Sequence, residues 1–111
     1  MEIRKPLRLS AVLLGAGFVF YVLVGLLHPG GPANNHVVVF GEYASSASWT
    51  AVHLGQFAGM AVIIAGLLAL YFALDVRDGG AAWVARLGAV AAVVALGLYG
   101  VLQAVDGVAL K

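Results

Sequence analysis

Three long runs of apolar residues leave this chain few ways to fold. They cover residues 9–27, 51–74 and 82–104, and they are almost free of charge, with Arg86 near one end of the third. At a rise of about 1.5 Å per residue, the shortest run makes a helix of about 28 Å, close to the thickness of a hydrocarbon core. A chain that is 63% hydrophobic and 10% charged also lacks the polar residues for a water-facing surface. We therefore expect an all-α integral membrane protein with three transmembrane helices that form one domain in a lipid bilayer.

The basic residues predict how these helices cross the membrane. Lys111 alone lies on one side, and the other basic residues precede the first run or flank the second connection: Arg4, Lys5, Arg8, Arg77 and Arg86. The positive-inside rule then places the N-terminus in the cytoplasm and the C-terminus outside, in a bacterial inner membrane. Basic residues before an apolar run also occur in signal peptides. The run is longer than a usual one, however, and no small-residue cleavage pattern directly follows it, which favours a retained span.

The external connection, residues 28–50, begins with the stretch HPGGPANNH. Its prolines and glycines end the first helix, and Asn35 can cap a short amphipathic helix that reaches about Ala44. The apolar side chains of VVVF and the ring of Tyr43 would face the membrane surface. A strand over VVVF is the alternative, but it would have no partner at a membrane boundary. The other connection, DVRDGGA, is short, so we expect an antiparallel helical hairpin in which Gly79 and Gly80 stop the second span.

Small residues at four-residue spacing predict where the helices pack, because close approach in lipid depends on them. The predicted packing residues are Gly55, Gly59, Ala61, Ala65 and Ala69 in the second span and Gly88, Ala92, Gly97 and Gly100 in the third. Three helices cannot bury every such ridge, which favours self-association or a further membrane subunit as partner. The alternative is that the four-residue spacing arises by chance, because Gly and Ala are abundant in membrane proteins of this kind, and does not mark contact surfaces.

Polar side chains gather at the external ends of the predicted spans. His28 closes the first span, His53 and Gln56 open the second, and Gln103 and Asp106 close the third. Polar residues inside membranes are the default place to look for function. Because the first two spans run antiparallel, His28 and His53 should lie at a similar depth.

Three interpretations of this polar cluster compete. In the structural one, which we favour because helix ends need such partners, His53 bonds to a loop carbonyl or Asp106 and the glutamines bond across helices. His28 would then cap the end of the first helix. In the second, a divalent metal binds to a set drawn from His28, His36, Glu42, His53 and Asp106. In the third, His28 or His53 ligates a haem or chlorin, for which three spans offer little room.

Other function classes find little support in the sequence. The chain has no cysteine, which excludes disulfides and thiolate chemistry, and its net charge of +1 does not indicate a nucleic-acid surface. No motif typical of hydrolases, P-loop proteins or dinucleotide-binding enzymes occurs, and no charged residue lies at mid-membrane as transporters require. We therefore expect an accessory or stabilising subunit of a larger membrane assembly rather than an enzyme, with a cofactor- or metal-binding protein as the alternative.

The start of the second span, HLGQ, and the end of the third, QAVDG, carry a family resemblance. From about residue 9 onward the chain resembles a group of uncharacterised bacterial polytopic membrane proteins. The resemblance implies no activity. It does imply that this three-span region is the N-terminal part of a longer protein, with an external stretch and further spans after residue 111.

Overall fold

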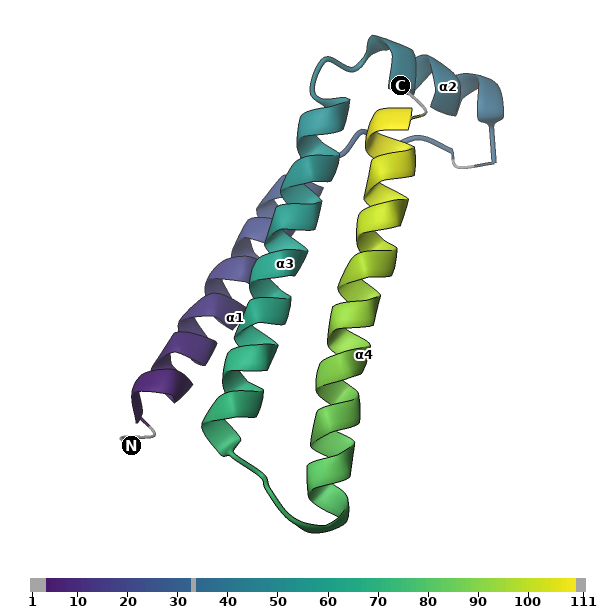
Figure 1. The fold of residues 1–111 in the computed structure, drawn as a ribbon. Coiled ribbons are helices and arrows are strands. Elements are labelled where there is room, and N and C mark those ends of the chain that lie inside the picture. The colour runs from purple at the N-terminus through teal and green to yellow at the C-terminus, as the bar shows by residue number, and fades with distance from the viewer. Residues whose placement is uncertain (1–3, 33, 110–111) are drawn as a thin grey trace.

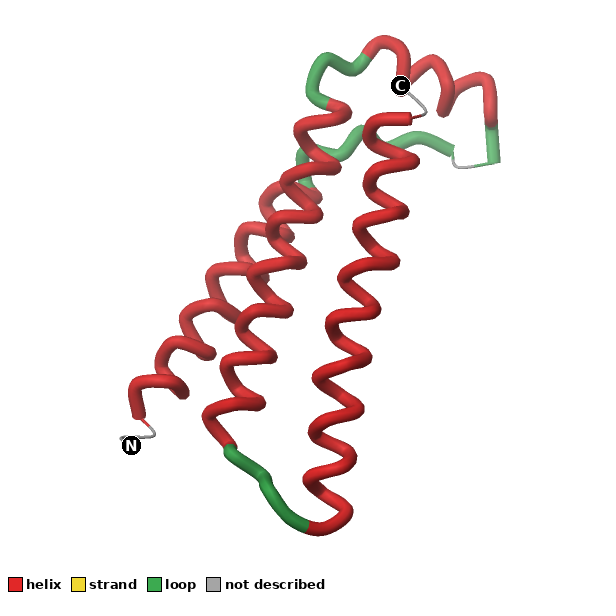
Figure 2. Tube along the Cα trace, viewed as in Figure 1, coloured by secondary structure: helices red, strands yellow, loops and turns green. Residues whose placement is uncertain are grey.

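The fold is a bundle of long helices with one short helix across its end (Figure 1). The computed structural model describes residues 4–32 and 34–109, and these contain helices, turns and loops but no strand (Figure 2). The elements in chain order are α1 (Arg4–Gly25), α2 (His36–Ser45), α3 (Trp49–Leu74), α4 (Gly79–Ala104) and the π-helical turn η1 (Val105–Ala109).

Three of these helices are long and apolar enough to cross a membrane: α1, α3, and α4 together with η1. This confirms the predicted all-α fold with three helices able to span a membrane. The helices extend beyond the apolar runs, since α1 starts at Arg4 and α4 starts at Gly79. Helix formation depends on backbone propensity as well as on hydrophobicity, and Arg, Lys and Leu are good helix formers in the first turns of α1.

The connection between α3 and α4 differs from the prediction. Gly79 and Gly80 do not stop α3; they form the first turn of α4. The stop is Asp75, which takes the left-handed conformation with φ of 46°. Asp is one of the few side-chain-bearing residues that visit this region readily, and here both carboxylate oxygens accept hydrogen bonds from Arg77.

Helix α1 packs closely along α3, and glycine makes the close approach possible. A Cβ added to Gly59 would lie 3.1 Å from the Cα of Tyr21, and one added to Gly55 would lie 2.9 Å from a methyl group of Val24. Near the other end of the pair, the hydroxyl of Ser10 donates to the carbonyl oxygen of Gly66 at 2.8 Å. The predicted Gly55 and Gly59 ridge is thus the surface of α3 that contacts α1.

Helix α4 has buried residues toward both of its ends, Ala82 near the start and Gln103 near the finish. Gly100 lies against the ring of Phe57, and the Tyr99 hydroxyl donates to the Tyr21 hydroxyl at 3.2 Å. By contrast, a Cβ at Gly88 or Gly97 would meet no heavy atom within 4 Å. Of the other predicted packing residues, Ala65 is exposed, whereas Ala61, Ala69 and Ala92 are partly buried.

The two ends of the bundle differ in character (Figure 1). The start of α1 and the α3–α4 connection lie at one end, which we call the basic end. Among the described residues it carries five basic side chains, counted from 4–8 and 77–86, and the carboxylates of Asp75 and Asp78. We call the opposite end, which holds α2, η1 and residues 26–32 and 34–35, the histidine end. There α2 starts after Asn35, whose side chain accepts a hydrogen bond from the Val38 amide.

Candidate functional site

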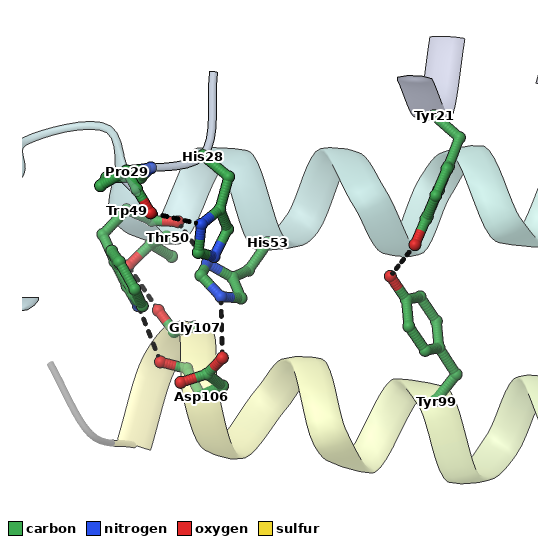
Figure 3. Close-up of polar contacts among 9 residues, drawn as sticks. All are labelled: Tyr21, His28, Pro29, Trp49, Thr50, His53, Tyr99, Asp106 and Gly107. Atoms are coloured by element: carbon green, nitrogen blue, oxygen red, sulfur yellow. Dashed lines mark hydrogen bonds and ion pairs between the residues drawn. The ribbon is translucent and has the colours of Figure 1, made fainter. Parts of the chain in front are cut away.

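His28, His53 and Asp106 meet at the histidine end, although they come from three separate parts of the chain (Figure 3). His28 lies in the turn after α1, His53 lies one turn into α3, and Asp106 lies in η1. One nitrogen from each ring and one carboxylate oxygen lie within 4.8 Å of one another. The antiparallel arrangement of α1 and α3 therefore does bring the first two histidines to the same depth.

Backbone carbonyls fix which nitrogen of each histidine carries the hydrogen. His53 Nδ1 lies 2.8 Å from the carbonyl oxygen of Trp49, and His28 Nδ1 lies 2.8 Å from that of Pro29. A carbonyl oxygen only accepts, so both Nδ1 atoms must donate. In a neutral ring this leaves the Nε2 lone pair free to bind a proton or a metal.

The second nitrogen of His53 faces a carboxylate. Its Nε2 lies 3.1 Å from Asp106 Oδ2, and the His53 side chain is only 2% exposed. A neutral ring would set a lone pair against a carboxylate oxygen, so the contact needs a positive charge between the two atoms. Either a proton or a metal ion supplies it, and these two compete for the same place.

The π-helical turn η1 places Asp106 against His53. The indole nitrogen of Trp49 donates to the carbonyl oxygen of Asp106 at 2.8 Å, and the Thr50 hydroxyl donates to that of Gly107 at 2.7 Å (Figure 3). A Cβ at Gly107 would collide with the Cβ of His53. Glycine is therefore needed for this approach, and short π-helical segments occur frequently at functional sites.

Aromatic rings enclose the histidines. The ring centroid of Trp49 lies 4.6 Å from that of His53 and 5.0 Å from that of His28, and the Tyr43 ring packs at a tilt against Trp49 with centroids 4.3 Å apart. A hydrogen bond with Asp106, together with burial, raises the pKa of Tyr43 above its ordinary value near 10. The prediction that Tyr43 faces the membrane surface is therefore wrong, since its ring points toward the site.

A cavity of about 230 Å³ opens beside Asp106 and His28, and its wall includes the carboxylate-bearing Glu42 of α2. It holds room for a further small ligand. Sites for drug-sized molecules are larger, about 300–1,000 Å³. The geometry thus favours an ion with water over a haem or chlorin, which the sequence had left open.

The remaining predicted site residues lie apart from this cluster. His36 is the exposed first residue of α2, outside the group whose ligand atoms converge. Gln56 is half-buried with its amide nitrogen toward Gly25 of α1. Gln103 is buried one turn before Asp106, and its Oε1 has no hydrogen-bond partner in the described part of the chain, so the predicted bond across helices is not found for that atom.

The structural interpretation of the cluster is confirmed for His53, while His28 bonds to the end of α1 through its backbone and not through its ring. His53 bonds to Asp106 as expected, and also to a carbonyl of its own helix. The backbone amide of His28 donates to the carbonyl oxygen of Gly25, the last residue of α1, while its ring donates to that of Pro29. Sequence reasoning missed Trp49 as a member of the site, although its spacing of four residues from His53 places both on one helix face.

Comparison of the chain with protein families, curated proteins and solved structures finds no similar protein. The resemblance to an uncharacterised bacterial family stays a prediction, as does the expected continuation after residue 111.

Proposed function

We propose that this membrane protein binds a divalent transition-metal ion through His28, His53 and Asp106. The observation that carries the proposal is the pair of histidines whose Nδ1 atoms both donate to carbonyls while a carboxylate converges on the same point. Metal-ligating histidines almost always donate their other ring nitrogen in this way. Two imidazoles and one carboxylate suit Zn²⁺ and its first-row neighbours.

The distances support a tetrahedral ion. Bonds of about 2.0–2.2 Å place neighbouring donors of a tetrahedral zinc site about 3.4 Å apart. His53 Nε2 and Asp106 Oδ2, at 3.1 Å, lie close to that spacing. All three donor atoms lie within 4.8 Å of one another, so shifts of up to about 1.4 Å bring them to that spacing. Glu42 or a water molecule from the adjacent cavity supplies the fourth.

Zinc titration of the purified, chelator-stripped protein tests this proposal. We expect one equivalent of Zn²⁺ to bind, with an affinity that rises with pH because binding displaces protons. His53→Gln and Asp106→Asn should each weaken binding at least about tenfold. His36→Gln is the matched control and should leave it unchanged. Absence of zinc binding by a folded wild type, or an equal loss in the His36 variant, would contradict the proposal.

A second candidate is a subunit that packs against further membrane helices, as a second copy or within a larger assembly. The observation in its favour is that Gly88 and Gly97 have open space where a Cβ would lie. Gly97→Leu should then weaken the association measured by the mass of the detergent-solubilised particle. A wild type that is a stable monomer without a co-purifying partner would contradict it.

We further propose that the basic end faces the cytoplasm of a bacterial cell and that α2 lies on the external surface of the inner membrane. The excess of basic over acidic residues at that end supports this orientation. The exposed apolar residues Val37 and Phe40 of α2 support contact with the headgroup region.

A further inference from the structure

The basic end holds a second site, unrelated to the histidine cluster. A polar cavity of about 260 Å³ is lined by the last residues of α3, the α3–α4 connection and Arg86 of α4. An apolar groove of about 400 Å³ lies between α3 and α4. Tyr71 and Phe72 line both spaces, so the cavity and the groove lie next to each other.

Arg86 gives the polar cavity its free positive charge. Arg77 is already paired, since its guanidinium donates two hydrogen bonds to the carboxylate of Asp75. Arg86 donates to the Arg77 carbonyl oxygen and lies over the Trp83 ring, 5.4 Å from its centroid. It has no acidic partner among the described residues. A guanidinium with free donors is the group that binds phosphate with two parallel hydrogen bonds.

The groove has the chemistry of a site for part of an acyl chain. Its walls are apolar or aromatic, with Leu68 and Phe72 on α3 and Val90, Val93 and Val94 on α4. Its lining on α4 runs from Ala89 to Val94, a rise of about 8 Å. Half of a hydrocarbon core about 30 Å thick is about 15 Å, so the groove covers about half of one leaflet.

We propose that the α3–α4 groove binds one anionic phospholipid, with its phosphate on Arg86 and an acyl chain along Val90, Val93 and Val94. The occupant is argued from charge complementarity at the mouth together with the apolar wall below it. The surplus of basic residues at this end would also concentrate anionic lipids around the site. The site is distinct from the metal site, and neither proposal depends on the other.

Lipid binding by the delipidated protein in detergent tests the proposal. Native mass spectrometry would compare phosphatidylglycerol with phosphatidylcholine carrying the same acyl chains. We expect phosphatidylglycerol to bind about fivefold more tightly, because one basic side chain near an anionic lipid contributes about that factor. Arg86→Gln should remove the preference, while Arg86→Lys should keep part of it.

Arg8→Gln is the matched control, because Arg8 is an exposed basic residue of the same end that does not line the cavity. It should leave the preference intact. Ala89→Leu, which narrows the groove, should weaken both lipids alike, and glycerophosphoglycerol without acyl chains should not compete. Circular dichroism verifies that each variant is folded.

Several outcomes would overturn the proposal. One is equal binding of the two lipids by the wild type, and another is an equal loss in the Arg8 and Arg86 variants, which would indicate general charge attraction. If glycerophosphoglycerol displaced the lipid at an equal concentration, the acyl chain would contribute nothing to binding, which would exclude the groove as its site. A dimer that retains no lipid would show that a second copy covers this face.

Discussion

Gly107→Ala perturbs the candidate metal site at the point where it is most tightly packed. The added Cβ would collide with the Cβ of His53 and lie 2.8 Å from its Cγ. The added Cβ and the His53 side chain can separate only if α3 or η1 shifts, because the His53 ring is held by hydrogen bonds to Trp49 and Asp106. Gly97→Ala is the control, since a Cβ there meets nothing within 4 Å.

The difference between these two variants isolates the collision. Replacing Gly by Ala in a helix is favourable by up to about 1 kcal/mol, and both variants share this gain. Forcing extra atoms into a packed site costs about 1–3 kcal/mol. We therefore expect Gly107→Ala to be less stable than Gly97→Ala by about 1–3 kcal/mol.

Two measurements check this expectation. Unfolding in detergent, followed by circular dichroism, should show a lower midpoint for Gly107→Ala than for Gly97→Ala. Zinc titration should show affinity reduced about tenfold or more in Gly107→Ala only, because a displaced Asp106 no longer meets His53. Equal midpoints for the two variants would refute the packing of η1 on α3. A lower midpoint with unchanged zinc affinity would refute the assignment of Asp106 as a ligand.

Three further predictions concern other parts of the molecule. Ser10→Ala removes a buried hydrogen bond between α1 and α3 and should lower the free energy of unfolding by about 1 kcal/mol; no change would contradict the bond. The raised pKa of Tyr43 stabilises the fold fully below pH 10 and loses this effect as the pH rises through the raised value. Ultraviolet titration should therefore show one fewer late-titrating tyrosine in Tyr43→Phe than in the wild type. Because the chain has no cysteine, Ala44→Cys and Asp78→Cys each introduce a single thiol. An impermeant maleimide should label only Ala44→Cys in intact cells, and the reverse pattern would invert the proposed orientation.

The membrane helices were predictable because their signal is local. An uncharged apolar run long enough to cross a bilayer leaves the backbone no alternative to a helix. The ends of the helices were less predictable, since they depend on individual residues. Asp75 stops α3 in a conformation that glycine normally takes, while the two glycines four and five residues later begin α4.

The candidate site was predictable in its members and not in its geometry. His28 was predicted to lie near His53 because antiparallel spans put the end of the first and the start of the second at a similar depth in the membrane. The π-helical turn that places Asp106 against His53 depends on donors from α3, Trp49 and Thr50, which are more than fifty residues away in sequence. Such long-range contacts leave no periodic signal. The inward position of Tyr43 has the same origin, since its ring packs on Trp49.

The polar cluster also explains how α4 is attached to the other helices. In lipid no hydrophobic force drives helices together, so packing and hydrogen bonds must do so. Gly88 and Gly97 make no close contact, and α4 is instead held by the bonds of η1 to α3 and by Tyr99. An ion bound to His28, His53 and Asp106 would connect the end of α1, the start of α3 and the end of α4. The structural and metal-binding interpretations are therefore compatible, because the same side chains that close the bundle offer the ligands, and loading with metal should tighten the attachment of α4.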